Sequence, residues 1–204
     1  MKEDSNKRKR DKEGTKKALL EAALAVFSEH GYDAATTREV AKRAQTSEAL
    51  IQRYFEGKAG LLLAITQQMM TAGNEELLAN LPFAPTLEED ILQVLNQSCT
   101  QLRCQSSFIR VVLSRAIVDT KLGLQMGEHL HKSRLPMLKM RLMHYQQKGQ
   151  VAPDLDLDAS AFAISGMTFT LGFMAPEVFA FDRTRLTAIA KSLAGTLARG
   201  MRKL

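Results

Sequence analysis

Apolar residues recur every three or four positions along most of this chain, which is the period of a helix with one buried face. The first such stretch runs from Thr15 to Gly31, where a glycine suits the backbone that ends a helix. Two shorter amphipathic segments then follow within residues 36–58, TTREVAKRAQTSEALIQRYFEGK. Neither is long enough to be stable alone, so both need longer helices to cover their apolar faces.

Side chains that can cap helices predict where these elements begin. Thr36 and Glu39 have the spacing of a capping box, in which each side chain bonds the other residue's backbone N–H. Ser47 can cap the next short helix, whose inner residues would include Phe55. A fourth, longer helix is predicted to begin at Lys58.

The rest of the chain also has helical periodicity. Pro82 and Pro85 interrupt it, so LPFAPT (81–86) is predicted to link a small N-terminal module to a larger remainder. No alternating strand pattern flanked by hairpin signals occurs, and the predicted fold is all-α. The predicted C-terminal helices begin after Thr86, at Phe108, before the stripe Leu135–Tyr145, after an Asp158 cap, and after Asp182.

Two short helices joined by a tight turn and braced by longer ones describe a helix-turn-helix, in which the second short helix can enter the DNA major groove. The residues GYDAATTREVAKRAQTSEALIQRYFEGKAGLL (31–62) resemble the N-terminal module of TetR-family transcriptional regulators. The resemblance extends over roughly residues 15–65. It predicts a helix-turn-helix DNA-binding domain at 15–60 and a helical effector-binding and dimerisation domain at 61–204. The polar, charged residues 1–14 predict a flexible basic arm.

The resemblance also implies roles for individual residues. The side chains at the start of the second helix and near the end of the third would contact phosphates, and those on the outer face of the third would meet base edges. The implied phosphate contacts are Thr37, Arg38, Tyr54 and Lys58. The residues at or near the bases are Ser47, Glu48, Ala49, Leu50 and Gln52, and Arg53 could serve either a phosphate or a guanine.

Three positions depart from the usual family pattern. Gln45 stands where the turn usually has glycine, so a left-handed backbone there would be strained. Gln52 replaces an aromatic residue that usually precedes Arg53, which removes one phosphate contact and offers a base contact instead. Glu48 would be repelled by phosphate unless its carboxylate accepts a hydrogen bond from cytosine.

The positive net charge is compatible with a polyanionic partner but does not prove one. The formal net charge is +6, and residues 103–150 carry nine basic and two acidic side chains. The basic run Lys7–Arg10 could be a solvated tail or could follow DNA. The charged N-terminus predicts no secretory signal. Cys99 and Cys104 lie on different sides of a predicted helix, so a disulfide between them is not expected. Together these features predict a cytoplasmic protein without a membrane partner.

The resemblance assigns the C-terminal half to a small-molecule effector and to a homodimer whose last two helices pair with their twofold mates. An apolar pocket and an anion site using Arg110, Arg115 or Arg141 both remain open. The candidate effector residues are Met69, Arg110, Met140, His144, Phe169 and Phe173. The candidate dimer residues are Phe162, Leu186, Ile189, Leu193 and Leu197.

The predicted function is a ligand-responsive regulator, most simply a repressor, that binds a palindromic operator of double-stranded DNA as a dimer. The alternative is a helical protein-interaction module without sequence-specific DNA binding. An enzyme is the weaker rival, because the sequence has no Gly-rich phosphate loop and no nucleophile elbow. No catalytic residue, cofactor or metal is expected.

Overall fold

The computed structural model describes residues 2–71 and 78–202, with the backbone alone for 2–11 and 69–71. Its described part contains helices and no strand, as the all-α prediction requires. Residues 1–71 and 107–123 form one compact unit, and residues 72–106 and 124–204 form a second. We call them the N-terminal unit and the C-terminal unit. The division into domains at residue 60 stays a prediction.

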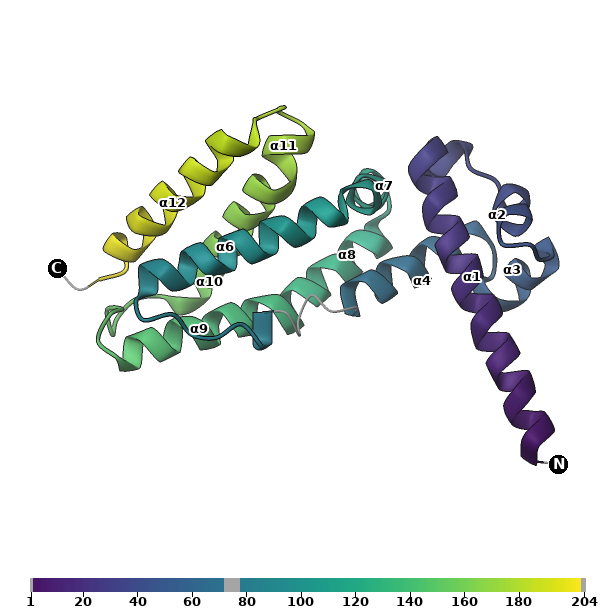
Figure 1. Cartoon of the computed structure of the whole chain (residues 1–204), viewed down its shortest axis with the longest axis horizontal. Coiled ribbons are helices and arrows are strands. Elements are labelled where there is room, and N and C mark those ends of the chain that lie inside the picture. Colours follow the sequence, from purple (N-terminus) through teal and green to yellow (C-terminus); the bar gives the residue numbers. More distant parts are fainter. Residues whose placement is uncertain (1, 72–77, 203–204) are drawn as a thin grey trace. The chain divides into compact units, whose positions relative to one another are not determined.

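The N-terminal unit contains the predicted set of short and long helices (Figure 1). Its helical geometry is interrupted at Gly31, where φ is +75°, close to the predicted end of the first helix. Its elements are α1 (Lys2–Ala34), α2 (Thr37–Arg43), α3 (Glu48–Phe55), α4 (Lys58–Thr71) and most of α7 (Ser106–Ala116).

The first helix begins much earlier than the sequence pattern suggests. The predicted arm at 1–14 is helical from Lys2 onward. Lysine, arginine and glutamate dominate these residues and are good helix formers, and Gly14 lowers the local propensity most, by about 1 kcal/mol. The apolar pattern marks only the part of a helix that packs against something, so it could not reveal this extension.

The two short helices are stabilised by the longer ones. α1 packs against α2 and α4, and α3 packs against both α2 and α4. The apolar side chains of α2 and α3 that face inward, Val40 and Ile51, are buried against this framework. The outer sides of α2 and α3 are thereby left to solvent.

In the C-terminal unit, α6 lies between α12 and α9 (Figure 1). α6 also packs against α10 and η2, and α9 packs against α10. The elements are α6 (Leu87–Cys104), most of α8 (Thr120–His129), the π-helical segment η1 (Leu130–Arg134), α9 (Leu135–Gln147), α10 (Leu157–Phe169), the π-helical segment η2 (Thr170–Met174), α11 (Ala175–Glu177) and α12 (Arg183–Gly200).

The predicted caps in this unit are mostly confirmed. Thr86 and Glu89 form the expected capping box of α6, and Asp182 caps α12. The predicted Asp158 cap is wrong by two residues: Asp156 caps α10, and its carboxylate accepts hydrogen bonds from the backbone N–H groups of residues 158 and 159. Helix α8 was not predicted, because its apolar residues are few and only Leu122 is buried.

The predicted linker LPFAPT is instead part of the C-terminal unit's core. The Arg141 guanidinium donates hydrogen bonds to the carbonyls of Leu81, at 2.7 Å, and Pro82, at 3.0 Å. The Tyr145 hydroxyl is 2.7 Å from the carbonyl of Ala84. Prolines end helical periodicity equally well in a free linker and in an anchored loop, so the pattern could not distinguish the two.

Among the described residues, one segment is long and apolar enough to cross a membrane by length and composition. It is Leu157–Glu177, and 39% of its most apolar window is buried within the protein. A core helix of a soluble protein passes the same test, so this is weak evidence for a membrane segment.

Candidate functional site

The first short helix, α2, is fixed at its start and tied to α1 near its end. The Thr36 N–H donates to Glu39 Oε2 at 2.9 Å, and the Glu39 N–H donates to Thr36 Oγ1 at 3.2 Å. The Thr36 hydroxyl also donates to Glu39 Oε2, at 2.8 Å. This bond and the one from the Thr36 N–H favour the ionised carboxylate and lower the pKa of Glu39. At the other end, Arg43 pairs with Glu29 of α1 at 2.6 Å. The predicted capping box is confirmed, and α2 cannot rotate freely against α1.

The turn between α2 and α3 is tight and contains one strained residue. Gln45 has φ +52°, so the usual glycine of this turn is replaced by a side chain in the left-handed region. The Thr46 N–H donates to Ala41 O at 3.0 Å and closes the turn. Ser47 lies at the N-cap of α3 as predicted, although its side chain makes no capping hydrogen bond.

Gln45→Gly is expected to stabilise the protein by about 1 kcal/mol, because glycine adopts positive φ without a Cβ clash. The Gln45 side chain is exposed, so little packing is lost. The free energy of unfolding from urea denaturation checks this. Gln150→Gly is a contrasting control. The Gln150 side-chain oxygen accepts a hydrogen bond from the Leu87 N–H at 2.8 Å, so its removal should destabilise the protein. A loss of stability in Gln45→Gly would show that its side chain makes a contact of its own.

The outer face of α3 presents side chains suited to base edges. Ile51 is 1% exposed and holds the helix to the unit, whereas Glu48, Ala49, Gln52 and Arg53 are exposed and Leu50 is partly so. The four exposed residues cover one continuous side of the helix, because 100° separates successive residues. Amide, carboxylate, guanidinium and methyl groups can all read the major groove.

Thr37 and Glu48 are brought together by the fold. The Thr37 hydroxyl donates a hydrogen bond to Glu48 Oε1, which links the starts of α2 and α3. A phosphate contact by the Thr37 hydroxyl would therefore compete with this bond. Glu48 is also held in one direction at the start of the exposed side of α3 formed by Glu48, Ala49, Gln52 and Arg53, which we call the recognition face.

A cluster of cations surrounds Tyr54 at the edge of this face. The Lys12 and Lys16 ammonium groups lie 5.7 and 5.9 Å from the centre of the Tyr54 ring, and the Arg53 guanidinium lies 5.9 Å from it. Arg38 at the start of α2 is exposed. The sequence interpretation omitted Lys12 and Lys16, although their spacing of four placed them on one side of a helix. This cluster can attract phosphates beside the exposed side chains of α3.

Lys58 has a structural position that argues against the predicted phosphate contact. Its ammonium donates to the carbonyls of Tyr32, Asp33 and Ala35 at 2.8, 3.1 and 2.9 Å. An ammonium has three protons, so these three bonds use all of its donors. The carbonyls belong to the end of α1 and the residue that follows it, where helices leave such groups unpaired. Lys58 therefore joins the start of α4 to the end of α1.

The candidate effector residues do not share one environment. Arg110 is exposed in the N-terminal unit, Met140 is 48% exposed, and His144 stacks on Phe83 with ring centres 3.9 Å apart. Phe169 and Phe173 stack on each other at 5.4 Å, and Phe173 is buried. Met69 lies in α4, and its side chain is outside the described residues. Of the proposed anion-binding arginines, Arg141 is occupied by Asp90, and Arg115 lies over the Tyr32 ring.

The candidate dimer residues also divide into two groups. Leu186 is 5% exposed and packs in the core of its own chain, so a partner could not reach it. Ile189, Leu193 and Leu197 are partly buried at the edge of the same core, and Phe162 is 59% exposed. Ala194 and Ala198, on the same helix, are also buried within this chain. The apolar spacing along α12 is therefore explained mainly by packing within one chain rather than by a dimer interface.

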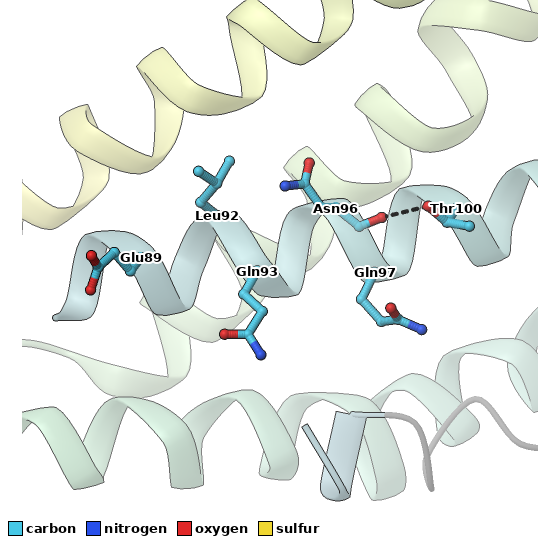
Figure 2. Close-up of a pocket in the computed structure, with 6 residues that line it drawn as sticks. All are labelled: Glu89, Leu92, Gln93, Asn96, Gln97 and Thr100. Carbon is cyan, nitrogen blue, oxygen red and sulfur yellow. Dashed lines mark hydrogen bonds between the residues drawn. The ribbon is translucent and has the colours of Figure 1, made fainter. Parts of the chain in front are cut away.

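Two of the hollows lined by described residues of the C-terminal unit are large enough to consider as sites. A groove of about 370 Å³ follows one face of α6, where Figure 2 shows Leu92 and Asn96 on one side and Gln93 and Gln97 on the other. Because one helix supplies all its lining residues, it is a solvated helix face. The second, about 570 Å³, lies between η1–α9 and α10 and is lined in part by Leu135, Pro136 and the exposed Phe162. No group of metal-ligating side chains occurs among the described residues.

Known proteins similar to this chain are regulators of transcription. Residues 19–65 match the family described as bacterial regulatory proteins, tetR family. The chain is 28% identical over 158 residues to YdeS of Bacillus subtilis, an uncharacterized HTH-type transcriptional regulator, and 77% of each chain is covered.

Solved structures extend this similarity to nearly the whole chain. The fatty acid degradation regulator FadR from Bacillus halodurans has 26% identity and a TM-score of 0.72, covering 91% of this chain and 99% of that one. FadR from Bacillus subtilis, solved in complex with stearoyl-CoA, has 22% identity and a TM-score of 0.74, covering 91% and 98%. At this identity the second likeness shows the fold alone.

Proposed function

Because the chain belongs to the TetR family of transcriptional regulators, we propose that it binds a palindromic DNA operator as a homodimer and is released by a small-molecule effector. We further propose that it is a repressor, whose release would free the operator for transcription. The observation that carries this proposal is the exposed side of α3, with Glu48, Gln52 and Arg53 beside the cations around Tyr54. Reading a bacterial operator places the protein in the cytoplasm.

Different side chains would supply the affinity for DNA and the specificity for its sequence. Lys12, Lys16 and Arg53 would neutralise phosphates, which supplies affinity for any sequence. Gln52 would read adenine and Glu48 would accept from cytosine, which supplies discrimination between sequences. In support of this division, Lys12, Lys16 and Arg53 lie around Tyr54, beside the exposed side of α3 that carries Glu48 and Gln52.

A homodimer would provide the symmetry that a palindromic operator requires. The most exposed aromatic of α10, Phe162, borders the apolar part of the hollow between α9 and α10, and a second copy is its proposed occupant. Two recognition helices must enter successive major grooves about 34–36 Å apart. An effector that changed this separation would lower the affinity for the operator, and by reciprocity the operator would lower the affinity for the effector equally.

A library of random DNA duplexes should yield an inverted repeat when selected by the purified protein. Gln52→Ala should then cost about 1–3 kcal/mol at one symmetric base position. Lys16→Ala should weaken binding to specific and scrambled DNA alike and reduce the salt slope by about one. Fluorescence anisotropy at several salt concentrations measures both effects.

Selection of no sequence, or of an unsymmetrical one, would favour the protein-interaction module instead. Equal losses for both variants on both DNAs would overturn the assignment of roles to Gln52 and Lys16. Stearoyl-CoA is a reasonable first compound in the search for an effector, because a FadR of the same fold was solved with it.

A further inference from the structure

Two arginines reach the interior of the C-terminal unit, and their surroundings differ in one respect. Arg141 is 3% exposed, and its Nε and Nη2 donate to the two oxygens of Asp90 at 2.9 and 2.5 Å. Further bonds to backbone carbonyls complete its set of partners. Its charge is therefore balanced by a carboxylate that is equally buried.

Arg134 has no such counterion among the side chains that the structure describes. Its Nε donates to Ser165 Oγ at 3.1 Å, and its Nη2 donates to Ser98 Oγ at 3.1 Å. Both partners are neutral hydroxyls. Burial without a nearby carboxylate lowers the pKa of the Arg134 guanidinium. The Arg134 side chain is partly buried, and a partly desolvated cation whose partners are neutral can still pair with an anion.

The surroundings of Arg134 combine polar groups with an apolar wall. Ser98 on α6 and Ser165 on α10 are both buried, so three elements meet at this guanidinium. Their chain neighbours Cys99 and Ile164 belong to the apolar core. Such a setting would accept a ligand that has one charged group and an apolar body.

The backbone around this position departs from regular helix twice. Arg134 is the last residue of the π-helical segment η1, and η2 follows directly after α10. η2 packs closely on α6: a Cβ at Gly172 would lie 2.8 Å from Leu102 Cδ1 and 3.0 Å from Cys99 Cα. Short π-helical segments inside helices are frequent at functional sites. Here η1 directs an arginine toward α6 and α10.

One edge of the guanidinium also remains open to a ligand. The contacts with Ser98 and Ser165 use two of its five N–H groups. Among the described residues, two side-chain polar atoms are buried from solvent without a hydrogen-bond partner, and they are Gln125 Oε1 and His144 Nε2. No atom of Arg134 is in this set. Its Nη1 makes no hydrogen bond within the described part of the chain, so it is open to solvent rather than sealed in the apolar core.

We propose that Arg134, Ser98 and Ser165 bind the anionic group, a carboxylate or a phosphate, of an effector whose body is apolar. The guanidinium would offer two parallel N–H donors, and the two hydroxyls would turn their protons to the same anion. This inference rests on the proposed function in one respect: anion binding would release the protein from DNA only if it is a DNA-binding regulator. Binding of the anion itself can be measured without DNA.

The test compares octanoate and octyl phosphate with the neutral octanamide. The thermal midpoint of the wild-type chain should rise more with at least one of the two anions than with octanamide. Calorimetric titration should show at least a tenfold loss of affinity for that anion in Arg134→Gln, with an unchanged response to octanamide. Arg183→Gln, which removes an exposed arginine of α12, should bind as the wild type does.

A second measurement separates this role from a purely structural one. Without any ligand, Arg134→Gln should be at least as stable as the wild type, because the uncompensated charge is removed, whereas Arg141→Gln should be less stable. The inference is overturned if neither anion exceeds octanamide, if Arg134→Gln keeps the preference, or if its ligand-free form is destabilised as Arg141→Gln is. DNA selection by Arg134→Gln should still yield the wild-type site, so a failure of DNA binding would count against the proposed function instead.

Discussion

Gly60→Ala is expected to destabilise the N-terminal unit by about 3 kcal/mol or more, at the upper end of what overpacking costs. A Cβ at Gly60 would lie 1.5 Å from the carbonyl oxygen of Phe55 and 2.7 Å from its carbonyl carbon. Both atoms are backbone, so no side-chain rotation can relieve the collision. α4 would have to move away from the end of α3, and the recognition face would move with it.

Thermal unfolding and operator binding would both report this change. Gly14→Ala is the matched control, because it makes the same substitution in α1 with no atom within 4 Å of the new Cβ. It should stabilise the helix by up to about 1 kcal/mol. Equal behaviour of the two variants would mean that α3 and α4 do not approach as closely as the structure shows.

Features determined by neighbouring residues could be predicted from the sequence. The capping boxes at Thr36 and Thr86 depend on residues three apart, and both are present. The two short helices with their turn are local in the same sense, and the strain anticipated at Gln45 is present. The family resemblance rests on this same local stretch.

Features determined by distant residues could not be predicted in this way. Lys58 looks like a free cation at a helix start, and only the approach of residues 32–35 turns its protons inward. Leu186 has the spacing expected for either a partner's surface or its own core, and a single sequence does not distinguish them. Arg134 and Arg141 are equally basic in the sequence, and only the fold places a carboxylate beside one of them.

Removing Arg141 should produce the largest loss of stability in the C-terminal unit. Arg141→Gln leaves the Asp90 carboxylate buried without its cation, which costs about 3–5 kcal/mol. The loop at 81–84 also loses the donors that hold two of its carbonyls. Urea denaturation measures the free energy of unfolding. Lys139→Gln is the comparison, because it breaks a 2.7 Å pair with Asp158 that is exposed on both sides and worth about 0–1 kcal/mol.

The double variant Arg141→Met with Asp90→Leu shows which part of this loss comes from the unpaired charge. With both ions gone, no charge is left buried, so the double variant should be more stable than Arg141→Gln alone. It should not regain wild-type stability, because the carbonyls of Leu81 and Pro82 lose their donors in either case. Asp90→Leu also removes one partner of the Tyr145 hydroxyl. Burial and the hydrogen bond to Asp90 raise the pKa of Tyr145, which keeps its hydroxyl neutral throughout. A double variant no more stable than Arg141→Gln would assign the loss to the loop carbonyls rather than to the charge.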